Sequence, residues 1–143
     1  GGITLCDVPI DIGKIKTPSY FISTIEDHIA PWKGVYRGAT CLGGPVRFVL
    51  GGSGHIAGIV NPPSANKYGY WSNDGKSLPE TPEEWFDASE QHQGSWWTDW
   101  QKWVTDIDDR KVPARDPAKG KLKVIEDAPG SFVKFRLDTQ KKA

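Results

Sequence analysis

The sequence contains no methionine, not even at position 1, where it begins Gly1-Gly2. Because a primary translation product starts with methionine, we expect this chain to be a processed or shortened piece of a longer protein. Cysteine is also scarce, since only Cys6 and Cys41 occur and they form no C-x-x-C pair. One disulfide between them is possible, but we expect unpaired thiols in a reducing cytoplasm.

Net charge and long apolar runs are absent as well. The 18 basic and 18 acidic residues cancel, which gives no reason to expect nucleic acid or an anionic membrane as a partner. No stretch reaches the roughly 18 consecutive apolar residues of a transmembrane helix, and no signal-peptide pattern opens the chain. Tryptophan, by contrast, is abundant: the chain has 7, and such side chains need large aromatic surfaces to pack against.

The first half of the chain predicts one β-α-β unit. Residues 18–25 (PSYFISTI) are typical of a buried strand, 33–42 of a short helix, and 46–50 (VRFVL) of a second strand. Two strands joined by such a crossover are parallel, and both end at one edge of the sheet. The loops that follow them carry Asp27 and His55. We therefore expect these two side chains to emerge from neighbouring strands on the same side.

The second half predicts a long loop and then two helices. Residues 61–79 are rich in turn formers, and Thr81-Pro82-Glu83-Glu84 predicts a capped helix that ends near Gln93. A second helix is expected over 95–107, where four apolar residues form one stripe that should face the core: Trp96, Trp100, Trp103 and Ile107. The other expected elements are a loop or short hairpin over 1–16 and short strands over 121–125 and 131–137.

The glycine cluster around His55 (GGSGHIAG, residues 51–58) admits three interpretations. It fits the dinucleotide pattern G-x-G-x-x-A, but Pro62-Pro63 would stop the helix that this site requires. Ser53 lacks the second glycine of a G-x-S-x-G nucleophile elbow. In the third interpretation the loop presents His55 as a general base, and Asp27 fixes its tautomer. At this point a purely structural role, as a loop histidine and a helix cap, stays open for both.

At these residues the sequence resembles the C-terminal part of class I polyhydroxyalkanoate synthases. The matching stretches are EDHIAPW (26–32), RFVLGGSGHIAGIVNPP (47–63), YWSND (70–74), EEW (83–85), GSWWTDWQKW (94–103) and DAPGSFVK (127–134). The resemblance implies an α/β fold, with residues 1–143 as a single partial domain. That domain would be the C-terminal portion of an α/β-hydrolase fold, with parallel strands, flanking helices and Trp-rich C-terminal helices.

The resemblance also implies the chemistry. The family polymerises (R)-3-hydroxyacyl-CoA into polyester, releases CoA and uses a Cys-His-Asp triad, to which this chain would supply Asp27 and His55. The family's cysteine lies upstream in a G-x-C-x-G elbow, and neither Cys6 nor Cys41 has those glycines. We therefore expect the chain alone to be inactive. Whether His55 or Asp27 activates the chain hydroxyl stays open.

The alternative is a catalytically incomplete fragment that acts only in self-association or in binding a granule or partner. Expected partners are the acyl-CoA and the polyester, with a homo-oligomer (dimer) and granule association in the cytoplasm, and with no nucleic acid and no membrane span. We expect no cofactor, and no metal site, because the histidines show no ligand spacing.

Five further residues carry expectations. His28 and Asn61 are candidates for supporting contacts to the pair, Asn61 through side-chain to backbone hydrogen bonds. Tyr36, like Trp32, is expected to pack rather than to bind substrate. His92 is expected at the surface or as a cap at a helix end.

Overall fold

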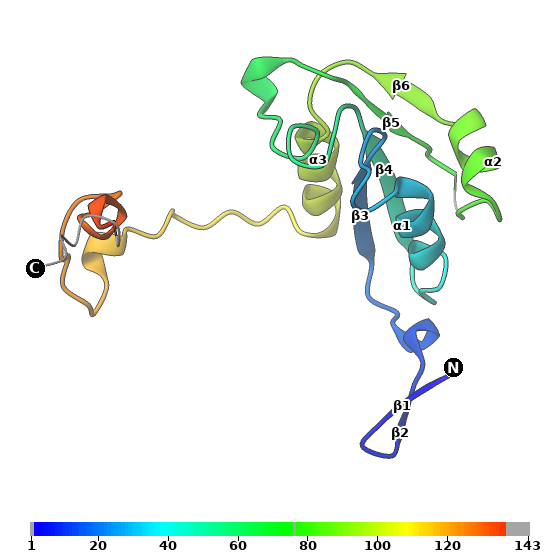
Figure 1. Cartoon of the computed structure of the whole chain (residues 1–143), viewed down its shortest axis with the longest axis horizontal. Helices are drawn as coiled ribbons and strands as arrows, with labels where there is room; N and C mark the ends of the chain where they lie inside the picture. The colour runs from blue at the N-terminus through cyan, green and yellow to red at the C-terminus, as the bar shows by residue number, and fades with distance from the viewer. Residues whose placement is uncertain (1, 76, 137–143) are drawn as a thin grey trace, which may run out of the picture. The chain divides into compact units, whose positions relative to one another are not determined.

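The computed structural model describes residues 2–75 and 77–136 (Figure 1). The chain divides into two compact units, Gly1–Asp109 and Arg110–Ala143. The assignment of residues 1–143 to one partial domain stays a prediction. No helix of the described part is both long enough and apolar enough to cross a membrane.

The first unit is built around a mixed sheet with the strand order β3-β4-β5-β6. β3 (Ser19–Thr24) is parallel to β4 (Val46–Gly51), and α1 (Trp32–Ala39) connects them. β5 (Tyr70–Ser72) and β6 (Glu90–His92) add to β4 in antiparallel order. The parallel pair confirms the predicted β-α-β unit and the α/β class. The two antiparallel strands were not predicted.

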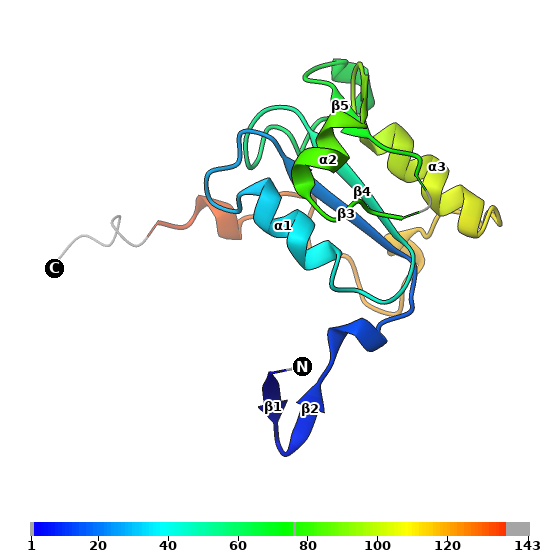
Figure 2. The same ribbon diagram turned by 90° about the vertical axis from the view of Figure 1, so that its right-hand side faces the viewer.

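The helices lie on both faces of this sheet. Figures 1 and 2 show α1 and α2 (Pro82–Asp87) on one face and α3 (Trp97–Ile107) on the other. α2 begins with the predicted capping box, in which the Thr81 hydroxyl accepts from the Glu84 N–H and the Glu84 carboxylate accepts from the Thr81 N–H. The box satisfies two donors that a helix start otherwise leaves unpaired.

Alternation along β4 separates an aromatic core from a polar contact. The Phe48 ring packs edge-on against Tyr36 of α1 and Trp85 of α2, with ring centroids 5.0 and 4.9 Å apart. All three side chains are buried. Arg47 points to the other face, where it pairs with Asp99 of α3. The core therefore lies between the sheet and the α1–α2 layer, and Tyr36 packs there as predicted. Trp32 packs against the same cluster.

The face of α3 that meets the sheet is centred on Asp99 rather than on the tryptophan stripe. Tyr20 of β3 contacts the rings of Trp96 and Trp103, and its hydroxyl donates to Asp99 at 2.9 Å. Because Asp99 turns inward to reach Tyr20 and Arg47, the helix rotates Trp100 outward, to 43% exposure; Ile107 is 57% exposed. The prediction that the whole stripe lies in the core is wrong for these two residues.

Two predicted segments differ from the sequence-based expectation. The predicted loop 61–79 contains β5, and the helix that starts after Thr81 ends at Asp87 instead of near Gln93, so that β6 can form. Such three-residue strands form because a partner strand is already in place, and local propensity gives little sign of them. The expected hairpin near the N-terminus is confirmed as β1 (Ile3–Leu5) and β2 (Val8–Ile10).

The second unit contains no strand within residues 110–136, so the strands predicted over 121–125 and 131–137 are wrong there. The described elements are two 3₁₀ turns, Pro117–Lys119 and Phe132–Lys134. Side chains such as Val124 and Phe132 are exposed and have no buried face to pack against, which removes the usual support for a strand. Leu137 lies outside the described residues.

The aromatic core generates a stability prediction with a matched control. Phe48 is 1% exposed, whereas Phe132 is 85% exposed. Phe48→Ala should lower the free energy of unfolding by about 3–5 kcal/mol, because it leaves a cavity between Tyr36 and Trp85. Phe132→Ala should change it by less than about 0.5 kcal/mol. Urea denaturation monitored by circular dichroism measures both, and equal losses would contradict this position of the core.

Candidate active site

Asp27 and His55 meet at the edge of the sheet where the two parallel strands end. Asp27 follows β3, His55 follows β4, and the Asp27 Oδ2 lies 2.7 Å from the His55 Nδ1. The expectation that both emerge on one side, from neighbouring strands, is confirmed. Their catalytic role stays a prediction at this stage.

The two oxygens of Asp27 have different partners. Its Oδ1 accepts the backbone N–H groups of Ile29 and Ala30, both at 2.9 Å, while its Oδ2 faces His55. The Ala30 N–H first and the His55 contact second lower the pKa of Asp27 from 3.8 to about 2, against the opposing effect of burial. The carboxylate is therefore ionised near neutral pH and acts as an acceptor, which places the proton of a neutral His55 ring on Nδ1.

Backbone hydrogen bonds join the two loops. Ile25 N–H donates to the Gly51 carbonyl at 2.9 Å, and Glu26 N–H donates to the Ser53 carbonyl at 3.1 Å. Ser53, two residues before His55, has a left-handed φ of 69°, which is uncommon for a residue other than glycine. Such a conformation persists only where the surrounding contacts fix it, and these two bonds are such contacts.

A single tight turn follows His55. Within it, Gly58 N–H donates to the Gly54 carbonyl at 3.0 Å, and Val60 N–H donates to the Ile56 carbonyl at 2.8 Å. No α-helix starts in residues 51–75, which are all described, so the loop lacks the helix that a dinucleotide phosphate site needs.

Gly58 lies where a side chain has no room. A Cβ there would lie 2.3 Å from the Gly52 carbonyl oxygen and 2.4 Å from the Thr24 methyl group. Thr24 is the buried last residue of β3. The turn after His55 is therefore packed directly onto the ends of both parallel strands.

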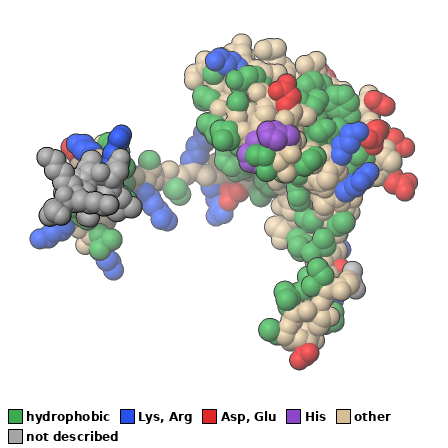
Figure 3. Space-filling model, viewed as in Figure 1, with side chains coloured by type: hydrophobic (Ala, Val, Ile, Leu, Met, Phe, Trp, Pro, Cys, Tyr) green, Lys and Arg blue, Asp and Glu red, His purple; other side chains and the backbone are tan. Residues whose placement is uncertain are grey.

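The second ring nitrogen of His55 remains available. Asp27 is almost covered, with a side-chain exposure of 7%, whereas the imidazole is 45% exposed. Within the described residues, no hydrogen bond is made to Nε2. Figure 3 shows histidine side chains at the surface beside hydrophobic ones. An imidazole held at Nδ1 and open at Nε2 can accept a proton from a group that approaches from outside.

The other candidate residues do not touch this pair. His28 is exposed and makes no hydrogen bond or ring contact among the residues that the structure describes. Asn61 is buried, and its Nδ2 donates to the Lys67 carbonyl at 2.8 Å, so it braces a later part of the loop. His92 lies on β6, where its Nε2 is 2.9 Å from the Ser72 hydroxyl. The expectation that it caps a helix end is wrong, because the helix stops before it.

Neither cysteine is placed to serve as the nucleophile of His55. Both are free and exposed. Cys6 lies in the turn of the β1–β2 hairpin, and Cys41 follows the end of α1, at the edge of the sheet opposite His55, where its Sγ contacts the Arg37 carbonyl at 3.3 Å. Within the described chain no thiol or hydroxyl is hydrogen-bonded to His55, and no group of three metal-ligating side chains gathers.

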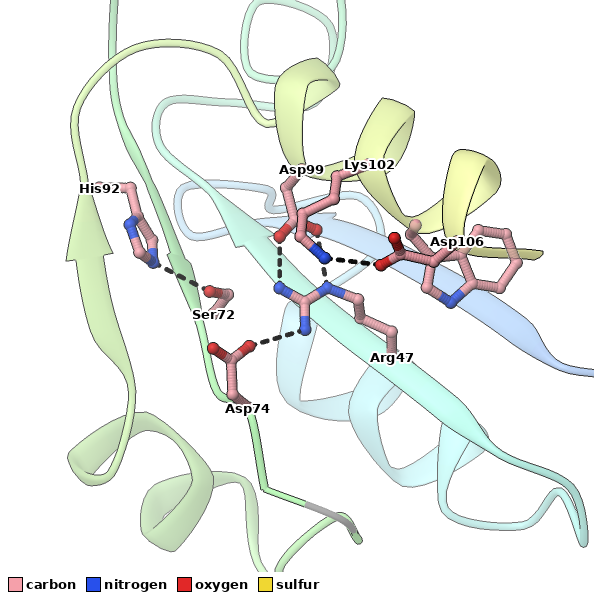
Figure 4. Close-up of a pocket in the computed structure, with 8 residues that line it drawn as sticks. Arg47, Ser72, Asp74, His92, Asp99, Lys102 and Asp106 are labelled. Carbon is pink, nitrogen blue, oxygen red and sulfur yellow. Dashed lines mark hydrogen bonds and ion pairs between the residues drawn. The ribbon is translucent and has the colours of Figure 1, made fainter. Parts of the chain in front are cut away.

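A polar hollow of about 280 Å³ lies on the α3 face of the sheet (Figure 4). Arg47, near the start of β4, donates to Asp99 through Nε at 2.7 Å and to Asp74 at 3.0 Å, and Lys102 pairs with Asp106 at 2.6 Å. Hydrogen bonding to Asp99 is the main cause that raises the pKa of Arg47. Arg47 and Lys102 are therefore paired with the chain's own carboxylates, and the Arg47–Asp99 contact fastens α3 to the sheet. Sequence reasoning missed this pairing, since no local pattern connects the two segments.

Comparison with known proteins finds similarity over nearly the whole chain. The chain is 42% identical over 137 residues to a protein named poly(3-hydroxyalkanoate) polymerase subunit PhaC from Cupriavidus necator, which covers 95% of this chain and 23% of that protein. The protein of the same name from Rhizobium meliloti is 48% identical over 136 residues, covering 95% of this chain and 22% of its own length. No protein-family model matches.

A third protein of that name, from Rhizobium etli, is 46% identical over 127 residues, covering 89% of this chain and 20% of the relative. The chain thus spans between a fifth and a quarter of the length of the curated relatives it matches.

The divided contacts of Asp27 generate a pH prediction. The pKa of Asp27 is about 2 in the folded chain and 3.8 in the unfolded chain. At pH values between these two, the unfolded chain therefore binds a proton at Asp27 and the folded chain does not. The stabilisation from Asp27 should be complete above about pH 4 and should be lost as the pH falls towards 2.

Asp27→Asn should therefore flatten the decline of unfolding free energy between these pH values, as measured by urea denaturation at a series of pH values. Glu26→Gln removes a neighbouring carboxylate that makes no side-chain hydrogen bond in the described residues, so it should leave this component of the slope in place. An unchanged slope in Asp27→Asn would refute the contacts assigned to that carboxylate.

The packing of the turn generates a second prediction. Gly58→Ala should displace the His55 loop, because its Cβ would overlap with the Gly52 carbonyl and the Thr24 methyl group. Gly54→Ala is the control, since the nearest heavy atom to its Cβ is the Glu26 carbonyl oxygen at 4.0 Å. Thermal unfolding should show a lower midpoint for Gly58→Ala alone, and the His55 ring signals in NMR spectra should shift only in that variant.

Proposed function

We propose that this chain is the C-terminal part of a polyhydroxyalkanoate synthase with an α/β-hydrolase fold. In that enzyme it supplies the aspartate and histidine of a Cys-His-Asp triad, which polymerises (R)-3-hydroxyacyl-CoA into polyester and releases CoA. The observation that carries the proposal is the 2.7 Å contact between Asp27 Oδ2 and His55 Nδ1, with Nε2 left open to a reacting group. The similarity to polymerases supports the class of substrate.

In the first step the thiol of the triad cysteine transfers its proton to His55 Nε2. The thiolate attacks the thioester carbonyl of the acyl-CoA, the bond between the acyl carbon and the CoA sulfur breaks, and the CoA thiolate leaves with the proton from His55. Asp27 remains ionised beside the imidazolium and stabilises it, because its pKa of about 2 lies far below neutral pH. The cysteine comes from a segment outside these 143 residues.

In elongation, the 3-hydroxyl group of one acyl unit attacks the next thioester and must lose its proton. A carboxylate with a pKa of about 2 is a weak base at neutral pH, and the Asp27 oxygens are already occupied by two backbone N–H groups and by His55. His55 is therefore the base in both steps, and Asp27 fixes the orientation and tautomer of its ring.

One observation favours a second candidate function, self-association or attachment to a polymer granule. Apolar side chains close to His55 in sequence and on α3 are exposed, among them Ile56, Val60 and Trp100. Exposed apolar patches of this kind mark contact surfaces. This function needs no nucleophile, so the 143-residue chain alone would be sufficient for it. Measurements of CoA release distinguish it from the triad function.

The proposal predicts the behaviour of a chimera in which this chain replaces the matching segment of the Cupriavidus necator polymerase. With 3-hydroxybutyryl-CoA, the chimera should release CoA, detected with a thiol reagent. His55→Ala should reduce the rate by at least about a thousandfold, because His55 is the base that the proposal assigns to the thiol. His28→Ala, an exposed histidine that does not touch the pair, should leave the rate unchanged.

Two outcomes would contradict the proposal. A chimera that is folded by circular dichroism but releases no CoA would reject the triad, and a multimer of the 143-residue chain in size-exclusion chromatography would then support association instead. A normal rate of acyl-enzyme formation in the His55→Ala chimera would refute the role of His55 while leaving the polymerase assignment intact.

A further inference from the structure

We propose that Trp96 and Trp97 are positioning residues for His55, an inference that rests on the proposed function of His55 as the base. Their two indole N–H groups hold the turn that follows the histidine. No other aromatic side chain in the described part of the chain donates a hydrogen bond to this turn.

The contacts connect the start of α3 to the backbone just after His55. Trp96 Nε1 donates to the Gly58 carbonyl at 3.1 Å and to the Ile59 carbonyl at 3.2 Å. Trp97 Nε1 donates to the Ile59 carbonyl at 3.0 Å. Three contacts from two neighbouring side chains thus converge on two consecutive peptide groups.

These carbonyl groups need an external donor. The hydrogen bonds inside the turn use the carbonyls of Gly54 and Ile56, so those of Gly58 and Ile59 are left over. A backbone carbonyl without a partner costs free energy when it is shielded from water, and the indole N–H groups remove that cost. The same turn also packs closely on Gly52 and Thr24 at Gly58. The tryptophans and the strand ends therefore both hold the turn.

Trp96 contacts the sheet that carries Asp27, and Trp97 packs against Trp96. The Trp96 ring lies 6.1 Å from that of Tyr20 on β3, and the Trp97 backbone N–H donates to the hydroxyl of Ser95 at 3.1 Å. Tyr20 and Arg47 hold Asp99 one turn further along α3. Strand β3 thus positions Asp27 through its own loop and His55 through α3, which sets the distance between the two partners.

Packing alone does not explain the orientation of Trp97. Its side chain is partly exposed, like that of Trp100, yet its N–H points to the Ile59 carbonyl instead of to water. Trp100 lies on the same helix, and its indole N–H donates no hydrogen bond among the described residues. It therefore serves as a matched control that differs in the hydrogen bond but not in residue type or helix.

The test compares Trp96→Phe/Trp97→Phe, Trp97→Phe and Trp100→Phe, in the 143-residue chain and in the chimera. In the chain, ¹⁵N NMR of the imidazole reports which nitrogen carries the proton. We expect the Nδ1–H tautomer to predominate in the wild type and in Trp100→Phe, and the Nε2–H tautomer to gain population in the other two variants. In the chimera, kcat should fall about tenfold in the double variant with KM unchanged, as for the loss of an ordinary hydrogen bond.

An unchanged tautomer ratio together with an unchanged kcat in the double variant would overturn the inference, even if His55→Ala abolishes activity and the proposed function stands. If the unsubstituted chimera is inactive, the proposed function fails, and the tautomer ratio alone then decides whether the tryptophans position His55. Should the double variant unfold, Trp97→Phe decides, because that side chain is partly exposed and loses one hydrogen bond. A shift of the same size in Trp100→Phe would assign the effect to lost aromatic volume.

Discussion

The parallel pairing of β3 with β4 is the constraint on which the site depends. Their register, from Ser19↔Val46 to Thr24↔Gly51, ends both strands at the same level. Asp27 and His55 are 28 residues apart in sequence, yet the ends of these strands bring Asp27 Oδ2 and His55 Nδ1 to 2.7 Å. Burial of Phe48 against α1 and α2 fixes the face of the sheet to which each β4 side chain points. A shift of the strand register by one residue would move every side chain to the opposite face.

The β-α-β unit and the meeting of Asp27 with His55 could be predicted because they follow from strong local patterns and one rule of connection, that strands joined by a crossover are parallel and end at the same edge. β5 and β6 could not, since Glu90–His92 carries no apolar alternation and becomes a strand only by pairing with β5. The prediction that the whole tryptophan stripe faces the core was wrong, because helical spacing cannot show that Asp99 turns inward. The partly buried Arg47–Asp99 contact decides that rotation, and it joins segments with no sequence signal in common.

The site shows how a small sheet is used on both faces. One face supplies the aromatic core, which stabilises the two parallel strands. The other face is polar at Arg47 and aromatic at Tyr20, and it fixes α3, whose first turn then reaches back to the histidine loop. Stability and the geometry of the site thus draw on opposite faces of the same strands.

If the proposed triad operates, the openness of the imidazole has a consequence for the fate of an acylated thiol. A ring that is 45% exposed admits water as readily as an alcohol, and water attacking the acyl group would end a growing chain as a free acid. Transfer to another acyl unit prevails over such hydrolysis only where solvent is kept from the reacting carbonyl. In the proposed enzyme, the protein surface that brings the cysteine to His55 would therefore also shield it from solvent.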